Sequence, residues 1–213
     1  MPLQNRVTPF GEFEATSARG TLMGNRGILH DDQQRLGRAR WKHKHWVACA
    51  LSFKGRKRPL MAPHAYTELF FCDEAVSLAA GHRPCSECRK ANYERFVTAW
   101  RKANGDLDGR TPRAGEIDTV LHKDRLTPER RKATSESALG LLPPGTFIAL
   151  PDEPSSAWLV GEGAIQAWSH AGYGEVRITS GTEMVTCLTP ASTVRALAAG
   201  YRPALHPTAR VIR

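Results

Sequence analysis

The feature that most constrains this chain is a pair of cysteines two residues apart, at the start of an amphipathic helical pattern. Cys85 and Cys88 lie in the run Pro84-Cys-Ser-Glu-Cys-Arg89, and no other two of the five cysteines are this close in sequence. A Cys-x-x-Cys turn aims two thiolates and nearby backbone N–H groups at one point, as a tetrahedral metal requires. The spacing therefore predicts a metal site, with zinc as the expected ion, at the beginning of a helix.

The residues around this pair have the patterns of a strand and two helices. A short strand is expected over residues 66–71 and a helix over residues 74–80, with Asp73 as its N-cap and Gly81 after its end. The second helix is expected to begin near Cys88. Its buried face is marked by four residues at helical spacing, Tyr93, Phe96, Val97 and Trp100.

The stretch from Leu69 to Arg89 resembles the second half of the Ada-type metal-binding domain of DNA-repair proteins. In that family an aromatic strand and a Gly-x-Arg-Pro-Cys-x-x-Cys segment lead into a helix, as Gly81-His-Arg-Pro-Cys-Ser-Glu-Cys88 does here. The family binds zinc with four cysteines and accepts a methyl group from DNA phosphotriesters on one of them. The resemblance implies that Cys85 and Cys88 bind zinc and that DNA is the partner. The family's first cysteine pair, with its methyl-accepting thiol, has no counterpart in residues 54–68.

A tetrahedral zinc site needs two further ligands. Cys49 and Cys72 are the candidate cysteines, although the alternation of the predicted strand at residues 46–53 puts Cys49 on an apolar face, which favours burial. The candidate histidines are His64, His82 and His206. If none of these is a ligand, Cys85 and Cys88 form a redox dithiol instead.

The charge balance predicts an anionic partner. Lys and Arg outnumber Asp and Glu by 30 to 21, a net charge of +9, and residues 35–46 contain no acid while alternating cations with two tryptophans. Cations neutralise phosphates, and indole rings stack on bases or pack beneath guanidinium groups. The candidate DNA-binding residues are Asn25, Arg26, Arg38, Arg40, Trp41, Lys42, Lys44, Arg56, Lys57, Arg58 and Arg89.

The Met-Pro start suggests a catalytic amine. Removal of the initiator methionine would leave Pro2 as a secondary amine, a nucleophile toward the aldehyde of an abasic site. In this respect the start resembles the formamidopyrimidine-DNA glycosylases and the tautomerases that use an N-terminal proline. Candidate proton-transfer partners are Glu12, His30, Asp31 and Glu68.

Three functions follow from these patterns. The leading expectation is a zinc-dependent DNA-binding protein with a repair or base-processing role, in its most concrete form a base-excision glycosylase and lyase acting through Pro2. The alternatives are a non-catalytic zinc module that binds nucleic acid and a small-molecule enzyme of the tautomerase kind. Whether the chain is an enzyme stays open at this point.

The predicted fold is α+β, with a metal-pinned strand-helix N-terminal half followed by a small β-barrel-like C-terminal half. The expected parts are a basic metal-binding domain at residues 1–103, a polar linker with one helix at 104–138, and a β-rich domain with a C-terminal helix at 139–213. The chain contains no apolar run long enough to span a bilayer and its start lacks a signal-peptide core, so the expected compartment is the cytoplasm.

Overall fold

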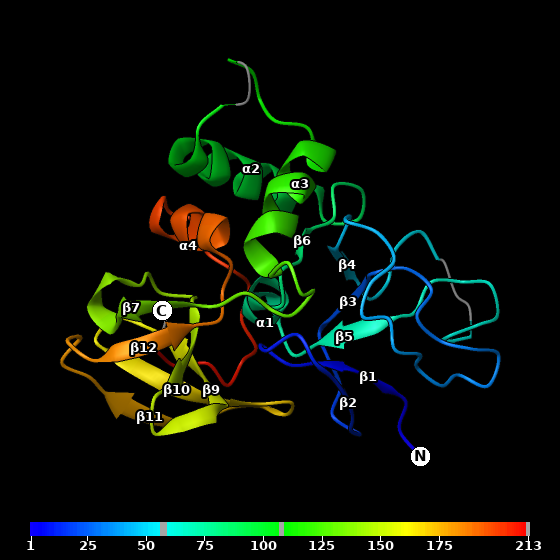
Figure 1. Cartoon of the computed structure of the whole chain (residues 1–213), viewed down its shortest axis with the longest axis horizontal. Coiled ribbons are helices and arrows are strands. Elements are labelled where there is room, and N and C mark those ends of the chain that lie inside the picture. Colours follow the sequence, from blue (N-terminus) through cyan, green and yellow to red (C-terminus); the bar gives the residue numbers. More distant parts are fainter. Residues whose placement is uncertain (56–58, 107–108, 212–213) are drawn as a thin grey trace.

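Two six-stranded sheets lie on either side of a short central helix, α1 (Figure 1). This arrangement comes from a computed structural model that describes residues 1–55, 59–106 and 109–211. The first sheet has the order β2-β1-β5-β3-β4-β6 and mixes parallel and antiparallel pairs. Its strands are β1 (Gln4–Val7), β2 (Phe13–Ala15), β3 (Leu22–Asn25), β4 (Val47–Ala50), β5 (Leu69–Phe71) and β6 (Arg83–Pro84).

The second sheet is open and antiparallel, with the order β11-β10-β9-β8-β12-β7. The α+β class is confirmed, whereas the predicted barrel is wrong, because β11 and β7 are edge strands. Both faces of the sheet carry apolar clusters, so it is covered without closing on itself. Its strands are β7 (Ser135–Ala138), β8 (Phe147–Leu150), β9 (Glu153–Val160), β10 (Ala164–Ser169), β11 (Gly172–Ile178) and β12 (Met184–Cys187). A short 3₁₀ turn, Leu139–Leu141, follows β7.

Helix α1 (Glu74–Ala79) is buried along its whole length and joins the two halves of the chain. The predicted N-cap is present, since Asp73 Oδ1 accepts the backbone N–H of Val76 at 3.0 Å. The other carboxylate oxygen of Asp73 accepts the hydroxyl of Tyr173 at 2.7 Å and the N–H of His206 at 2.9 Å. The core around α1 contains residues of both sheets, so the expected division into an N-terminal and a C-terminal half is not confirmed.

Three further helices pack together and lie above α1 in the view of Figure 1. They are α2 (Lys90–Asn104), α3 (Ala114–Arg125) and α4 (Ala191–Ala198). Phe96 and Trp100 of α2 are buried as predicted. Helix α3 is the helix expected within residues 104–138, and its Ile117 and Leu121 are fully buried in a cluster shared with α2 and α4. Within the described ranges, no helix combines the length and the apolar composition needed to cross a membrane.

Candidate metal centre and cationic hollow

Three cysteines from two neighbouring strands and the start of α2 form a candidate metal centre. Strand β4 pairs in parallel with β6, and the N–H of Cys85 donates to the carbonyl of Ala48 at 3.0 Å. This pairing puts Cys49, which follows Ala48, beside the Cys-x-x-Cys turn. The sulfur atoms of Cys49, Cys85 and Cys88 all lie within 4.8 Å of one another. The group can therefore hold a metal ion, and three soft thiolates suit zinc.

The surroundings of this group favour a thiolate. The backbone N–H of Ala50 donates to Cys88 Sγ at 3.4 Å. The pKa of Cys85 is lowered to about 5, mainly because the Cys49 thiol donates a hydrogen bond to it and because backbone N–H groups of the turn point at it. The pKa of Cys49 is raised, chiefly because it is the donor in that hydrogen bond and also because it is partly buried. One negative charge is thus stabilised in the group before a metal arrives.

The orientation of Cys49 differs from the predicted one. The residue of β4 that faces the core is Ala48, which is completely buried, whereas Leu51 is 55% exposed. Cys49 is half-buried and lies on the opposite face, toward the cysteine pair. The sequence places apolar residues on the face of β4 that carries Cys49, which predicts that this face is buried. The pairing of β4 with β6 explains why the face of Ala48 is buried instead.

The other candidate ligands lie elsewhere. Cys72 is buried in the hydrophobic core next to α1. The ring of His82 is fully buried and accepts a hydrogen bond from Arg26 Nε at 3.4 Å. His206 contacts Thr208 and His64 is exposed. Among the described residues, Cys49, Cys85 and Cys88 are the group of His, Cys, Asp or Glu side chains close enough together to hold an ion.

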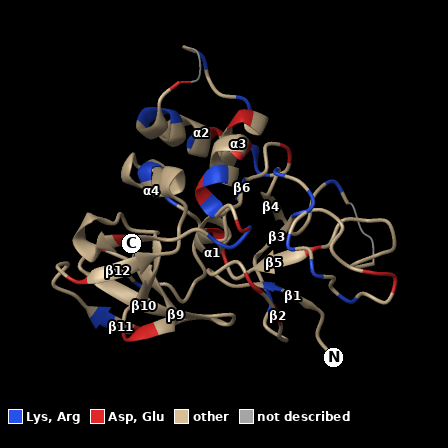
Figure 2. Ribbon diagram, in the orientation of Figure 1, with Lys and Arg blue, Asp and Glu red and all other residues tan. Residues whose placement is uncertain are grey.

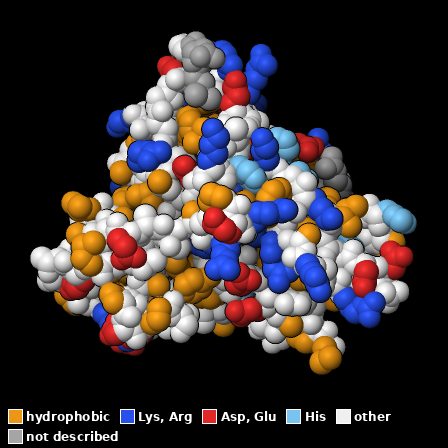
Figure 3. Space-filling model, in the orientation of Figure 1, with side chains coloured by type: hydrophobic (Ala, Val, Ile, Leu, Met, Phe, Trp, Pro, Cys, Tyr) orange, Lys and Arg blue, Asp and Glu red, His pale blue; other side chains and the backbone are white. Residues whose placement is uncertain are grey.

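A hollow of about 290 Å³ lies between the first sheet, the end of α3 and the turn that follows α3. We call it the cationic hollow, because six of its lining residues are basic and one, Glu12, is acidic. Figure 3 shows Lys and Arg side chains gathered on this face. In the ribbon of Figure 2, Lys and Arg positions are marked on α3 and in the loops beside the first sheet. The basic and aromatic residues that line it are Phe10, Arg26, Arg40, Trp41, Trp46, Arg125, Arg130, Arg131 and Lys132.

Two guanidinium groups enclose the buried indole of Trp46 in the hollow. The Arg26 guanidinium carbon lies 3.9 Å from the ring centroid and that of Arg125 lies 3.8 Å from it. Both arginines are buried, with exposures of 2% and 1%. Trp46 is therefore covered by arginines, one of the two packing modes expected for it, while half-buried Trp41 has Arg130 at 4.4 Å from its ring.

The buried cations donate to backbone carbonyls at the end of α1. Arg26 Nη2 donates to Ala80 O at 3.3 Å, Arg125 Nη1 to Gly81 O at 2.7 Å, and Lys132 Nζ to Ala79 O at 2.6 Å. Among the described residues, no carboxylate forms an ion pair with Arg26, Arg125 or Lys132. Three cations therefore share one small region, and the carbonyls that they contact there are neutral hydrogen-bond acceptors.

Burial and mutual repulsion disfavour these charges. The pKa of Lys132 is lowered to about 7, first by burial and then by the positive charges of Arg26 and Arg125. The pKa of Arg125 is lowered to about 9 by burial, although Asp118 raises it. Burial also lowers the pKa of His82 well below its ordinary value, so this ring stays neutral.

Sequence reasoning missed Arg125, Lys132 and Asp118 as site residues. Arg125 is one of several charged residues of its helix, and Lys132 belongs to a polar turn with no local motif. Asp118 is fully buried and binds the Arg83 guanidinium through both oxygens, at 2.8 and 2.7 Å, which fixes α3 against β6. Only the packing of α3 between the hollow and the other helices brings these residues into the site.

The predicted DNA-binding residues occupy different environments. Arg26, Arg40 and Trp41 line the cationic hollow. Lys44 has an exposed side chain, and its carbonyl accepts Arg125 Nη2 at 2.6 Å. Arg89 forms an ion pair of 2.8 Å with buried Glu74. Asn25 pairs with Val47 in the first sheet, Arg38 and Lys42 line a neighbouring pocket, and Arg56, Lys57 and Arg58 lie outside the described residues.

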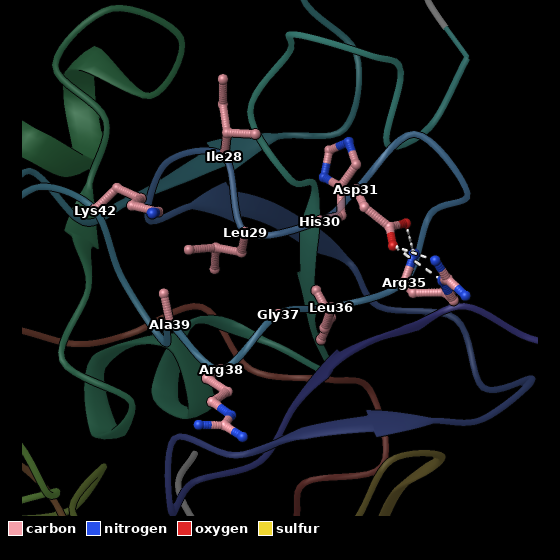
Figure 4. A pocket seen from close by; sticks show the side chains of 10 residues that line it. All are labelled: Ile28, Leu29, His30, Asp31, Arg35, Leu36, Gly37, Arg38, Ala39 and Lys42. Atoms are coloured by element: carbon pink, nitrogen blue, oxygen red, sulfur yellow. Dashed lines mark hydrogen bonds and ion pairs between the residues drawn. The ribbon is translucent and has the colours of Figure 1, made fainter.

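That neighbouring pocket, of about 350 Å³, is formed within the loop at residues 28–42 (Figure 4). Both ring nitrogens of His30 are engaged, Nδ1 with Thr67 Oγ1 at 2.6 Å and Nε2 with Ala62 O at 3.2 Å. Figure 4 shows Asp31 turned toward Arg35, and their ion pair measures 2.9 Å. These contacts hold the loop in place, and both side chains take part in them.

The five candidate catalytic residues lie in several different environments. Glu12 lines the cationic hollow, whereas His30 and Asp31 line the loop pocket. Buried Glu68 accepts the N–H of Met61 at 2.7 Å, and Pro2 is exposed ahead of β1.

The chain matches no protein-family model, no curated protein and no solved structure.

Proposed function

We propose that the chain is a DNA-binding protein whose contact surface is the cationic hollow together with the exposed basic loop at residues 35–46. The observation that carries the proposal is the trio of Arg26, Arg125 and Lys132, packed together with no carboxylate partner among the described residues. Uncompensated buried cations are unfavourable, and an anionic partner removes the cost. A phosphate backbone supplies that charge at many points.

The exposed residues around the hollow extend this surface. Lys42 and Lys44 are exposed in the loop, and Arg130 and Arg131 are exposed in the turn after α3. Their charges attract a polyanion over a distance and are screened by salt. A phosphate partner therefore explains both the buried and the exposed cations, whereas a small-molecule tautomerase explains neither.

In this proposal, zinc at Cys49, Cys85 and Cys88 has a structural role. The three cysteines connect β4, β6 and the start of α2, and buried Trp46 directly precedes β4. An ion at this junction holds β4 in place, and with it Trp46, which lies in the floor of the hollow. Loss of the ion is expected to loosen that floor and weaken DNA binding.

A base-processing step through Pro2 is the finer part of the proposal and has a separate test. An iminium between the freed Pro2 amine and an abasic site is trapped by borohydride as a covalent adduct. Incubation of the mature chain with abasic duplex and borohydride is expected to give this adduct, and the same chain with an acetylated N-terminus, which has no free amine, to give none. No adduct with the mature chain would leave a non-catalytic zinc module that binds DNA.

The DNA-binding proposal is tested by fluorescence anisotropy of a labelled duplex over a series of salt concentrations. We expect the logarithm of the binding constant to fall linearly with the logarithm of salt concentration. The double variant Lys42→Ala/Lys44→Ala is expected to reduce the slope by about 2. The matched control Lys90→Ala/Lys102→Ala removes the same charge from α2 and is expected to leave the slope nearly unchanged. Equal effects of the two double variants would contradict the assigned surface.

A further inference from the structure

The floor of the cationic hollow has hydrogen-bond donors in excess. Arg26 donates only at 3.2 to 3.4 Å, to two carbonyls and the neutral ring of His82. Arg125 Nε is buried and has no hydrogen-bond partner among the described residues. Buried donors are almost always satisfied, so the free Nε of Arg125 and the long hydrogen bonds of Arg26 leave room for a further acceptor in the hollow.

The cations face one small space. A Cβ atom built on Gly11, which has a φ of 85°, would lie 3.9 Å from Arg26 Nη2 and 3.9 Å from Lys132 Cδ. Both side chains therefore border the volume that the missing Gly11 side chain leaves open. Arg125 packs on the ring of Trp46 as Arg26 does, and all three cations line the same hollow.

A purely structural role does not account for this cluster. The three cations cap the carbonyl end of α1, a helix of only six residues. A cation at a helix C-terminus contributes about 0.3–1 kcal/mol, and one suffices for the dipole. The pKa of Lys132 is lowered first by burial and then by repulsion from Arg26 and Arg125, so the further cations do not stabilise one another. Such an arrangement is typical of a site that binds an anion.

The size and charge of the hollow select among phosphates. A volume of about 290 Å³ is too small for a passing duplex but suits one phosphate with its attached sugar. Three buried cations match a phosphomonoester, which carries about −1.5 to −2 charges at neutral pH, better than a singly charged phosphodiester. Glu12, which lies 3.9 Å from Arg40 at the rim, opposes an approach from that side.

We infer that the floor of the cationic hollow, formed by Arg26, Arg125 and Lys132 around Trp46, binds a terminal phosphomonoester. The group is the phosphate at the end of a nucleic-acid strand or on a free mononucleotide. The assignment of the phosphate to a nucleic-acid strand rests on the proposed function. The presence of an anion site does not depend on the proposed function. Binding is non-covalent and involves no bond exchange.

The test compares matched oligonucleotides that carry a 5′-phosphate, a 3′-phosphate or only hydroxyl ends, with inorganic phosphate and a mononucleotide as small probes. We expect one phosphorylated end to bind about 10-fold more tightly than the hydroxyl form, as measured by calorimetry and anisotropy. Lys132→Met, of similar shape, and Arg26→Gln are expected to abolish this preference. The control Lys123→Met, at an exposed position of α3, is expected to keep it.

The outcomes separate the anion site from the proposed function. Equal affinity for phosphorylated and hydroxyl ends overturns the inference, while a steep salt dependence would leave the DNA-binding proposal standing. Binding of inorganic phosphate or the mononucleotide, lost in folded Lys132→Met, with no affinity for any oligonucleotide supports the anion site and contradicts the DNA-binding proposal. Thermal unfolding of each variant shows whether it is folded. If Arg26→Gln does not fold, Lys132→Met alone decides.

Discussion

Lys132 is the residue whose protonation most directly controls the proposed anion site. Its pKa is lowered to about 7 by burial and by Arg26 and Arg125, whereas the pKa of Arg125, at about 9, keeps that group charged at pH 8. His82 is neutral across the same range, and Cys187 acts on Lys132 in the opposite direction, raising its pKa. An anion also raises the pKa of Lys132, so binding and protonation favour each other.

We therefore expect sulfate, which keeps its charge between pH 6 and 8, to bind more weakly as the pH rises through about 7. The affinity is expected to fall about 5- to 10-fold as Lys132 loses its proton. Calorimetry at pH 6 and pH 8 measures this change, and buffers of different ionisation enthalpy report proton uptake on binding at pH 8. A pH-independent affinity in the wild type, or the same decline in Lys132→Met, would contradict the role of Lys132.

At the scale of residues, the side chains of the two candidate sites could be predicted only in part from the sequence. Cys85 and Cys88 carry a local spacing that identifies them, and Arg26 stands in a glycine-bracketed turn where Gly27 has a φ of 106°. Arg125 and Lys132 have no such signal, because the partners that bury them lie 44 and 53 residues away in sequence. Long-range packing of this kind leaves no trace in a local pattern.

Among the elements, the parallel pairing of β4 with β6 brings Cys49 to the Cys-x-x-Cys turn and makes it the third candidate ligand of a metal ion. We expect about one zinc ion per chain purified without chelator. Cys49→Ser is expected to lower the metal content sharply and to reduce the melting temperature, because two thiolates hold the ion less firmly than three. The control is Cys72→Ala, in the core away from the centre, for which full metal content is expected. Elemental analysis and thermal unfolding measure both effects, and an unchanged metal content in Cys49→Ser would exclude this residue as a ligand.

The helices and most strands were predictable, since their signals are local. Asp73 caps α1, and the apolar spacing of α2 identified its buried face. The pairing of the strands was not predictable. Short apolar strands at regular spacing are typical of barrels and of open sheets alike, and here α1 and the first sheet cover one face, so the second sheet stays open.

For the whole molecule, buried Glu74 of α1 ties together segments that lie far apart in the sequence. Its carboxylate binds Arg89 ahead of α2 at 2.8 Å and accepts the Tyr201 hydroxyl at 2.7 Å and the Ala204 N–H at 2.8 Å after α4. The C-terminal segment is thus held against the metal-proximal helix. The candidate metal centre and the cationic hollow are therefore connected through the same packed core.

The most direct test of the central claim is hydrogen–deuterium exchange of the full chain with and without duplex DNA. Binding over the cationic hollow predicts slower exchange in two segments, the loop at residues 38–46 and the turn at 126–132, and unchanged exchange in β10 and β11. Protection confined to the second sheet, or the absence of any protection at a DNA concentration that saturates binding, would contradict the account.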